Sequence, residues 1–367
     1  MKPKVLFVVG TRPDCIKSVP VYQAFQNSAD FEAILVSTGQ HKEMLQQVFD
    51  VFQVTPDLDL GLMVPGQSLA SMSSRMIAEL DRAYAQFEPD YVFAQGDTTT
   101  TFIASLAAFY RGIPFGHIEA GLRTHNIRNP FPEEFNRQAT SLIAQHHFAP
   151  TLESAKNLEW EHIPNEAIFV TGNTGIDAVL AVAQAVEQTW YPDHEGPLVL
   201  VTMHRRENWG EPMREAAQAI LEVTLENPDV KVVVAMHKNP DVRATLTEVF
   251  GDCPQVDLIE PPEYMQFVKL MQRSDLILTD SGGVQEEAPS FGKPILVLRE
   301  TTERPEGLEA GFSVLVGTSR EKITSHYRTF MYDRSRLTSR SSTTNPYGDG
   351  KASQRILDVL TAHFQNV

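Results

Sequence analysis

Short apolar runs alternate along the chain with longer amphipathic stretches. Runs dominated by aliphatic and aromatic residues predict buried strands, and apolar side chains spaced three to four positions apart predict helices. In the first half we expect strands at Val5–Val9, Ala33–Ser37, Tyr91–Ala94 and Ile113–Ile118, and helices near residues 14–27, 68–87, 98–110 and 133–145. In the second half we expect strands at Leu198–Thr202, Val230–Ala235, Leu276–Thr279 and Ile295–Leu298, and helices near residues 211–226, 263–273 and 283–291.

This alternation occurs in two separate halves, connected by a segment near residues 171–196 that ends in turn-forming and charged residues. Strands that alternate with helices are typical of parallel sheets covered on both faces. A chain of 367 residues is also long enough for two domains of ordinary size. We therefore predict an α/β protein with two doubly wound, Rossmann-like parallel-sheet domains facing a cleft. Ligands of such folds bind outside the carboxyl ends of the strands.

The charge balance argues against two classes of partner. Acidic residues outnumber basic residues by 47 to 31, which gives a net charge of −16. A chain this acidic repels nucleic acid and anionic membranes, and no apolar run reaches the roughly 20 residues that span a bilayer. We therefore expect no nucleic-acid partner and no membrane partner.

The beginning of the chain and the cysteine count indicate where the protein acts. The first apolar run, Val5–Val9, is followed almost at once by Arg12 and Asp14, which predicts a buried strand rather than a targeting segment. Cys15 and Cys253 are the only cysteines in the sequence, so no disulfide framework can stabilise the fold. This usage fits a reducing compartment, and we expect a cytoplasmic protein.

The first motif, VVGTRPDCIK at residues 8–17, predicts a strand that ends at Gly10 and a helix that begins near Pro13. A helix N-terminus attracts anions, and Arg12 and Lys17 add positive charge there. The alternative is an ordinary turn with solvated charges. The pattern G-x-G-x-x-G is absent after every predicted strand, which argues against a nicotinamide cofactor.

Three carboxylates of the first half, two at strand ends and one at the start of a helix, are candidates for chemistry. Asp97 precedes a run of β-branched residues, Thr98–Thr101, and would either cap a helix or bind a polar ligand. Glu119 ends an apolar strand, where a charge is costly unless it is used or paired. Glu133 and Arg137 are four residues apart and share a helix face, so a structural interpretation pairs them. Separate carboxylates at one sheet edge are also what general acid–base catalysis requires.

A dense charged run, HRREN, follows the strand at 198–202 and contains His204 and Arg205. A purely structural role explains such a run poorly, because the carboxyl end of a parallel strand is where ligands bind. The spacing of zinc ligands is absent and cysteine ligands are lacking. We therefore expect no metal site here.

A third group of motifs is typical of diphosphate binding. Ser281, Gly282 and Gly283 follow a predicted strand, and their small side chains let the backbone approach a phosphate at a helix start. Glu287 lies about one turn into that helix, where it could accept hydrogen bonds from ribose hydroxyls. Arg304 follows the next predicted strand and supplies positive charge.

Together these motifs resemble those of the non-hydrolysing UDP-N-acetylglucosamine 2-epimerases. Eight blocks occur in the family's order between residue 5 and about residue 360: GTRPDCIK, GDTTT, HIEAGLR, PEEFNR, HRREN, DSGGVQEE, TTERPE and NPYGDG. In the first block, Asp14 and Cys15 stand where the family usually has glutamate and alanine. The resemblance implies two Rossmann-like domains of the GT-B type: residues 1–172, joined by a C-terminal helix near 352–367, and a UDP-binding domain at residues 173–351. It also implies a homodimer and no cofactor.

The resemblance assigns roles residue by residue. The positions that match family residues affecting catalysis or contacting the diphosphate are Arg12, Lys17, Asp97, Glu119, Glu133, Arg137 and His204. Phe267 matches the uracil-stacking position, and the UDP-binding set is Ser281, Gly282, Gly283, Glu287 and Arg304. The family also has a second, activating UDP-GlcNAc site, which is matched in part by Gln40, His41, Gln67, Arg205 and His237.

The reaction that the resemblance implies interconverts UDP-GlcNAc and UDP-ManNAc. The hydrogen on C2 is not next to a carbonyl, so its direct removal is implausible. The family instead eliminates UDP to give 2-acetamidoglucal, and UDP then adds back with the proton delivered to the opposite face. This chemistry needs acid–base groups and a clamp for UDP, and it needs no metal or nicotinamide.

Four alternatives share part of this pattern. The nearest is a 2-epimerase of a modified UDP-sugar such as UDP-2,3-diacetamido-2,3-dideoxyglucuronate, which would differ only in its sugar contacts. A hydrolysing epimerase would release free ManNAc. A GT-B glycosyltransferase would need an acceptor and would show no exchange at C2, and a UDP-sugar sensor would bind without turnover.

Overall fold

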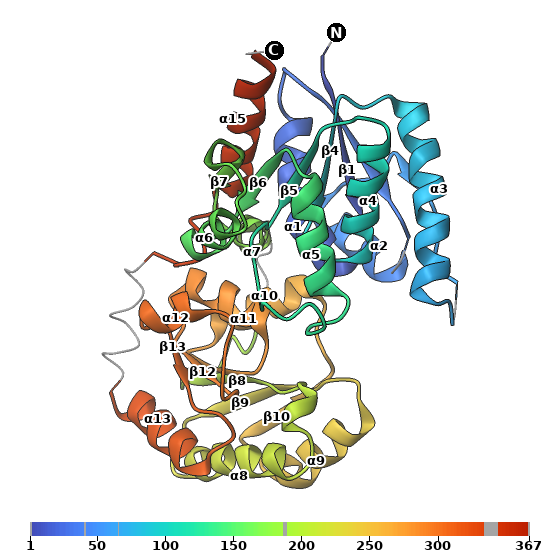
Figure 1. The fold of residues 1–367 in the computed structure, drawn as a ribbon. Helices are drawn as coiled ribbons and strands as arrows, with labels where there is room; N and C mark the ends of the chain where they lie inside the picture. Colours follow the sequence, from blue (N-terminus) through green and yellow to red (C-terminus); the bar gives the residue numbers. More distant parts are fainter. Residues whose placement is uncertain (1, 40–41, 65, 186–188, 334–343, 366–367) are drawn as a thin grey trace. The chain divides into compact units, whose positions relative to one another are not determined.

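A computed structural model describes residues 2–39, 42–64, 66–185, 189–333 and 344–365. The chain forms two compact units, Met1–Ala178 with Gly348–Val367 (the N-terminal unit) and Val179–Tyr347 (the C-terminal unit). Each unit has its own parallel sheet covered by helices, so the predicted fold class of two doubly wound α/β domains is confirmed (Figure 1). The first crossing between the units falls within α7 (Thr174–Ala185), and the second falls at Gly348.

The sheet of the N-terminal unit has seven parallel strands in the order β3-β2-β1-β4-β5-β6-β7. Chain order therefore reverses between β1 and β4, and loops that leave these two strands diverge to opposite sides. The strands are β1 (Lys4–Val9), β2 (Glu32–Ser37), β3 (Leu58–Asp59), β4 (Tyr91–Gln95), β5 (Phe115–Ile118), β6 (His146–Ala149) and β7 (Ile168–Val170).

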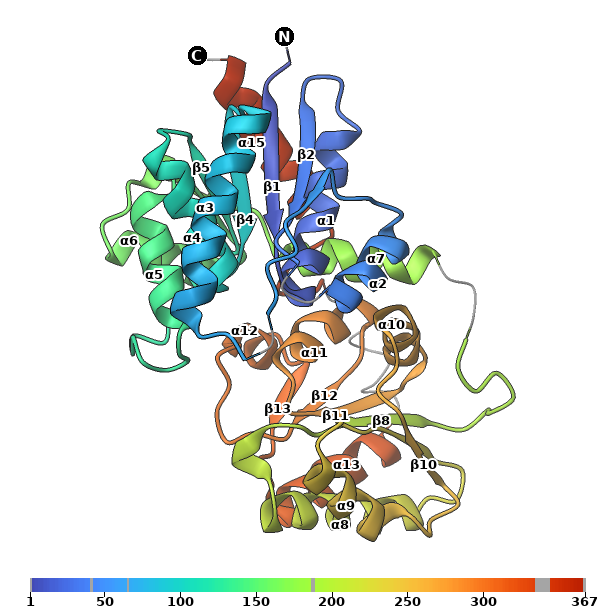
Figure 2. The ribbon, with the colours of Figure 1, turned by 90° about the vertical axis from the view of Figure 1, so that its right-hand side faces the viewer.

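Helices cover both faces of this sheet. In Figure 2, α1 and α2 lie on one side of β1 and β4, and α3, α4 and α5 lie on the other. The C-terminal helix α15 packs against α1 within the same unit. The helices are α1 (Arg12–Gln26), α2 (Lys42–Phe52), α3 (Leu69–Phe87), α4 (Thr99–Tyr110), α5 (Glu133–Ile143), α6 (Leu152–Trp160), α7 and α15 (Ala352–Gln365).

Strand β1 explains why the apolar runs are continuous rather than alternating. Leu6 and Val8 belong to the core beneath α3 and α4, whereas Phe7 points to the opposite face and meets Phe25 of α1 edge-on at 5.5 Å between ring centroids. Phe93 of β4 stacks on Phe7 at 5.0 Å. Because successive side chains point to opposite faces and both faces are covered, all five positions from Val5 to Val9 are apolar and buried.

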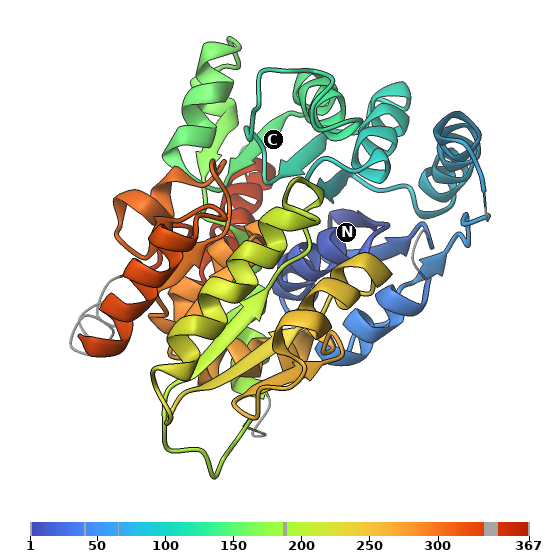
Figure 3. The same ribbon diagram turned by 90° about the horizontal axis from the view of Figure 1, so that it is seen from below.

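The C-terminal unit repeats the plan with six parallel strands in the order β10-β9-β8-β11-β12-β13. Its chain order reverses between β8 and β11. In Figure 3, α8 and α13 run side by side across one face. The strands are β8 (Leu198–Thr202), β9 (Lys231–Ala235), β10 (Val256–Ile259), β11 (Leu276–Thr279), β12 (Ile295–Val297) and β13 (Ser313–Leu315), and the helices are α8 (Glu211–Leu225), α9 (Pro240–Phe250), α10 (Tyr264–Arg273), α11 (Gly282–Glu287), α12 (Pro305–Glu309) and α13 (Arg320–Tyr332).

The strands expected from the sequence are present within a few residues, but short or polar strands were not predicted. These are β3, β6, β7, β10 and β13. The single helix expected over residues 283–291 was wrong: α11 ends at Glu287, and a 3₁₀ helix, η3 (Ala288–Phe291), follows. Pro289 has no amide hydrogen to continue the α-helical pattern, so the chain tightens there.

Candidate functional site

The turn between β1 and α1 is closed by a buried carboxylate. Asp14 accepts hydrogen bonds from the amides of Gly10 and Thr11, at 3.3 and 2.8 Å, and from the hydroxyl of Thr98 at 3.4 Å. Thr11 completes a capping box with Asp14. The amides of Gly10 and Thr11 are therefore already engaged by the Asp14 carboxylate.

Burial changes the acidity of this carboxyl. Desolvation raises the pKa of Asp14 to about 7, and hydrogen bonds from Thr11, Gly10 and Thr98 offset only part of that rise. Cys15, the next residue, is also fully buried, and desolvation together with the Asp14 charge raises the pKa of its thiol. Both residues are buried in the first turn of α1.

Glu119 is held at the end of β5 in an unusual backbone conformation. Its φ is +63°, in the left-handed region that non-glycine residues rarely adopt. Its side chain is 11% exposed and forms an ion pair with Lys17 of α1. Gly96, at the end of β4, lies beneath it: a Cβ on Gly96 would be 3.9 Å from Oε1 of Glu119. Lys17, Gly96 and Glu119 thus form one cluster at the carboxyl edge of the sheet.

Arg137 connects the end of β4 to α5. It pairs with Asp97 and, at 3.3 Å, with the buried Glu134. The interpretation that pairs it with Glu133 is wrong, although Glu133 lies half-buried in the same first turn of α5. Asp97 does not cap α4 either, because Thr98 is the N-cap and accepts from the amide of Thr101. The Asp97 carboxylate therefore pairs with Arg137 instead of capping the helix.

Glu134 is a site-shaping residue that the sequence analysis missed. Its carboxylate is fully buried and accepts from the amides of Thr124 and His125, at 3.1 and 3.2 Å, and from the side chain of Gln138 at 2.9 Å. It therefore holds the loop that follows β5 against α5. The signal was present as the doublet Glu133-Glu134, but the sequence does not say which member points inward.

In the C-terminal unit, His204 and Asp280 form a hydrogen-bonded pair across the point where chain order reverses. His204 follows β8 and Asp280 follows β11, and the two strands are neighbours. Nδ1 of His204 lies 2.7 Å from Oδ1 of Asp280, whose side chain is fully buried. Asp280 was also missed from the sequence, where it reads as a turn residue before Ser281-Gly282.

Gly282 provides room for an arginine. A Cβ on Gly282 would lie 2.5 Å from Cζ of Arg304, so only glycine allows the guanidinium to rest there. Glu286 fixes that guanidinium through a 2.8 Å bond to Nε, and Glu303 pairs with its Nη1 at 2.7 Å. Ser281 is the N-cap of α11. The predicted diphosphate-binding residues are thus brought together at the start of this helix.

The remaining two predicted UDP-binding positions lie on neighbouring helices. Tyr264 of α10 donates a hydrogen bond to Glu287 of α11 at 3.2 Å. Phe267 is three residues after Tyr264 on α10 and half-buried, so the two side chains lie close on the helix surface. A Cβ built on Gly283 would have no neighbouring atom within 4 Å, so the space beside this residue is open.

The NPYGDG block, residues 345–350, bonds to the backbone of Glu286 and Arg304. Asn345 donates to the carbonyl of Glu286 at 2.9 Å. The hydroxyl of Tyr347 accepts from the amide of Gly307 at 2.9 Å and donates to the carbonyl of Arg304 at 3.1 Å. The block therefore fixes the backbone of the residues that hold the Arg304 guanidinium.

Comparison with known proteins identifies the family. Residues 23–361 match the model of the family described as UDP-N-acetylglucosamine 2-epimerase. The chain belongs to the UDP-N-acetylglucosamine 2-epimerase family. It is 47% identical to the UDP-N-acetylglucosamine 2-epimerase of Bacillus subtilis, over 99% of this chain and 96% of the relative. It is 46% identical to that of Salmonella typhimurium, over 98% and 99% of the two chains.

A solved structure agrees with this assignment. The crystal structure of the UDP-GlcNAc 2-epimerase from Neisseria meningitidis bound to UDP-GlcNAc superposes with a TM-score of 0.88 at 44% identity, and the match covers 98% of this chain and all of that one. The likeness therefore extends over both units.

The positions that match the family's activating site are only partly described. Gln40 and His41 lie outside the described residues. Gln67 accepts a hydrogen bond from Arg75 in the N-terminal unit. Arg205 and His237 lie beside His204: the amide of Arg205 donates to Asp280 at 2.9 Å, and the rings of His237 and His204 are 6.0 Å apart. Burial, followed by the charge of His204, lowers the pKa of His237.

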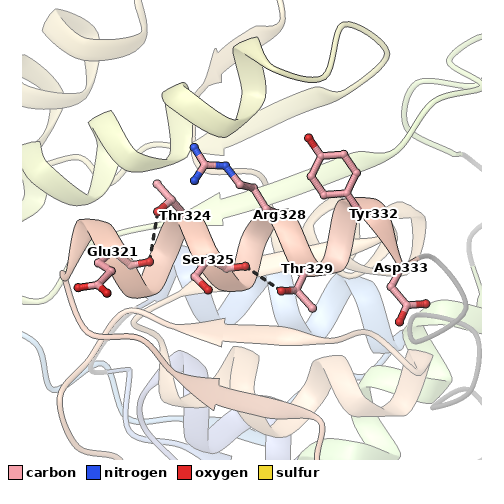
Figure 4. Close-up of a pocket in the computed structure, with 7 residues that line it drawn as sticks. All are labelled: Glu321, Thr324, Ser325, Arg328, Thr329, Tyr332 and Asp333. Atoms are coloured by element: carbon pink, nitrogen blue, oxygen red, sulfur yellow. Dashed lines mark hydrogen bonds between the residues drawn. The ribbon is translucent and has the colours of Figure 1, made fainter.

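A shallow hollow on the outer side of α13 contains none of the predicted site residues. It encloses about 650 Å³ and is lined by Glu321, Thr324, Ser325, Arg328, Thr329, Tyr332 and Asp333. Figure 4 shows that hydroxyls here bond to carbonyls of their own helix, as Thr329 does to Ser325 at 2.9 Å. Arg328 pairs with Glu222 and Glu226 of α8. These contacts stabilise the packing of α13 on α8.

Two absences concern the described part of the chain. Among those residues, no group of three or more histidine, cysteine or acidic side chains is arranged to hold a metal ion. No helix within the same ranges is long and apolar enough to cross a membrane.

We predict that Asp14 makes stability depend on pH. In the folded chain this carboxyl keeps its proton up to about pH 7, whereas its ordinary pKa is 3.8. Between these values the folded state binds more protons than the unfolded state, so stability falls as pH rises, by up to about 1.4 kcal/mol per pH unit. Asp14→Asn should remove this slope, and urea unfolding at pH 5, 6, 7 and 8 measures it.

The exposed Asp30 offers a matched control on the same unit. Asp30→Asn should leave the slope as in the wild type. Parallel stability curves for wild type and Asp14→Asn across this interval would show that the Asp14 carboxyl does not retain its proton.

Proposed function

We propose that this chain epimerises UDP-GlcNAc at C2 to UDP-ManNAc through elimination and re-addition of UDP. A base removes the C2 proton while the bond from C1 to the diphosphate oxygen breaks, which leaves a C1–C2 double bond in 2-acetamidoglucal. Return of UDP to C1 with protonation of C2 on the opposite face completes the inversion. Family membership and the UDP-GlcNAc bound by the Neisseria relative support this assignment.

The observation that carries the proposal is the set of restrained carboxylates at the sheet edge of the N-terminal unit. Glu119 and Asp97 are each held in an ion pair, with Lys17 and Arg137 respectively. An ion-paired carboxylate is ionised, which is the form that accepts a proton. Together with Glu133 they supply the acid–base groups that a two-face proton transfer requires.

The C-terminal unit and the β1–α1 turn supply the groups for UDP. We assign the diphosphate to Arg12, His204, Arg304 and the Ser281-Gly282-Gly283 turn, because donors and cations at a helix start stabilise the charge that develops on departing UDP. We assign the ribose to Glu287 and the uracil to Phe267. All steps use side chains and backbone groups, so no cofactor enters the scheme.

The reaction can be followed by proton NMR with UDP-GlcNAc in D₂O. Loss of the C2 proton signal with growth of UDP-ManNAc is expected. Free ManNAc would instead indicate the hydrolysing reaction. No exchange at C2 would overturn the proposal, and UDP-2,3-diacetamido-2,3-dideoxyglucuronate would then be the next substrate to test.

Substitution tests the acid–base roles in the same assay. Glu119→Gln and Asp97→Asn should each lower kcat by about 10²–10⁴-fold, because the amide cannot exchange the proton. Affinity for UDP should change little in either variant. Glu153→Gln, which alters only an exposed pair with Lys156, should keep wild-type turnover. Near-normal turnover in both Glu119→Gln and Asp97→Asn would contradict the assignment.

Gly282 should matter for UDP affinity through Arg304. Gly282→Ala places a Cβ where the guanidinium rests, and loss of a hydrogen bond to a charged group costs about 1.5–3 kcal/mol, or roughly tenfold or more in Kd. In an Arg304→Ala background the same substitution should cost little further, as calorimetric titration with UDP can measure. Equal losses in both backgrounds would show that Gly282 acts independently of Arg304.

We also propose that two copies of the chain associate, as the family resemblance implies, and bury an apolar groove of the N-terminal unit. The groove encloses about 400 Å³ and includes Ile127, Phe135 and Leu142, and Leu142 is 85% exposed. Exposed apolar patches of this kind mark protein interfaces. Leu142→Arg should convert a dimer to a monomer in light scattering, whereas Leu225→Arg on α8 should not. A monomeric wild type would exclude the dimer.

A further inference from the structure

We propose that Asp280 is a positioning residue that fixes the tautomer and orientation of His204, so that Nε2 of His204 faces the departing diphosphate. The inference rests on the proposed function for its catalytic consequence. Its structural part, the state of the His204 ring, can be tested without any turnover.

The hydrogen bonds of Asp280 converge on one turn. Besides the 2.7 Å contact with Nδ1 of His204, the carboxylate accepts from the amide of His204 at 2.9 Å and from the amide of Arg205 at 2.9 Å. Asn208 adds a weaker side-chain bond at 3.3 Å. All these donors belong to the segment that follows β8, so Asp280 holds the backbone of His204 and its ring at once.

The chemistry of the carboxylate decides which ring nitrogen carries the proton. Burial alone would raise the pKa of Asp280, but the hydrogen bond and charge of His204 and the backbone amides lower it below its ordinary value. An ionised carboxylate can only accept hydrogen bonds. Nδ1 of His204 must therefore be the donor, and Nε2 is the ring nitrogen that can meet a ligand.

Other contacts keep this arrangement rigid. Trp209 donates from its indole nitrogen to the carbonyl of His204 at 3.1 Å, so the backbone of His204 is held on both its amide and its carbonyl side. At the ends of β8 and β11, the hydroxyls of Thr202 and Thr279 lie 2.6 Å apart. The His204 side chain is nevertheless 36% exposed, which leaves its outer edge accessible.

The geometry separates the roles of the two residues. Asp280 is fully buried and its oxygens are occupied by protein donors, so it does not reach a substrate. His204 is the residue that can contact the substrate. With Nδ1 bonded to Asp280, Nε2 can donate to a diphosphate oxygen when the ring is protonated. The negative charge of Asp280 then offsets the positive charge of that imidazolium, as in other histidine–carboxylate pairs.

Nitrogen-15 NMR of the histidine-labelled protein tests the ring state directly. The His204 signals are assigned by their loss in His204→Ala, which is necessary because the chain has 11 histidines. We expect the neutral ring of the wild type to carry its proton on Nδ1. In Asp280→Asn, whose amide can donate to Nδ1, we expect the proton to move to Nε2. A wild-type proton on Nε2, or no change in Asp280→Asn, would overturn the inference.

Kinetics tests the consequence for catalysis. Asp280→Asn should lower kcat by about 10²–10⁴-fold with a smaller change in KM, because loss of the carboxylate charge disfavours the imidazolium of His204 that donates from Nε2 as charge develops on the diphosphate. In a His204→Ala background the same substitution should cost little more. Equal fold losses in both backgrounds would mean that Asp280 only stabilises the turn, and would overturn its positioning role.

Asp275 provides a matched control, because it directly precedes β11 and Asp280 directly follows that strand. Its carboxylate accepts from the amide of Leu198 at 2.8 Å, away from the carboxyl edge of the sheet. Asp275→Asn should keep wild-type kcat and the wild-type His204 tautomer. An inactive wild type would overturn the proposed function, and the NMR result would still decide whether Asp280 positions His204.

Discussion

The arrangement of both units depends on one constraint: all strands of a parallel sheet end at the same edge. Where chain order reverses, between β1 and β4 and between β8 and β11, the loops diverge and leave strand-end backbone groups that need partners. In each unit a buried aspartate meets that need, Asp14 in one and Asp280 in the other. Asp14 thereby fixes the turn that carries Arg12, and Asp280 fixes the turn that carries His204.

The two carboxylates resemble each other in place but differ in ionisation. Both accept backbone amides from the turn after the first strand of their unit. Asp14 has only neutral donors, and burial therefore raises its pKa to about 7. Asp280 also has a histidine, and its pKa is lowered despite burial. Elsewhere a cation compensates the carboxylate: Lys17 pairs with Glu119, Arg137 with Glu134 and Arg304 with Glu286.

The sequence predicts the fold well because continuous apolar runs and turn residues are local signals. It also singles out Glu119 and His204 as candidates, because each is a polar side chain at or just after the end of an apolar strand. The sequence does not show which residue of the doublets Glu133-Glu134 and Glu286-Glu287 points inward. In the structure Glu134 and Glu286 are the buried residues. Adjacent helix positions differ by about 100° in direction, so the choice requires knowing which face the tertiary structure covers. Asp280 was missed for a similar reason, since its partner lies 76 residues away.

Cys15 has a consequence for how the molecule can be studied. Its thiol is fully buried and its pKa is raised by burial and by Asp14, so it stays protonated and unreactive toward thiol reagents while the N-terminal unit is folded. Cys253, the only other cysteine, is partly exposed. The rate at which an alkylating reagent reaches Cys15 therefore reports local opening of the β1–α1 region. Cys15 is therefore a natural reporter of local opening beneath the turn that contains Arg12.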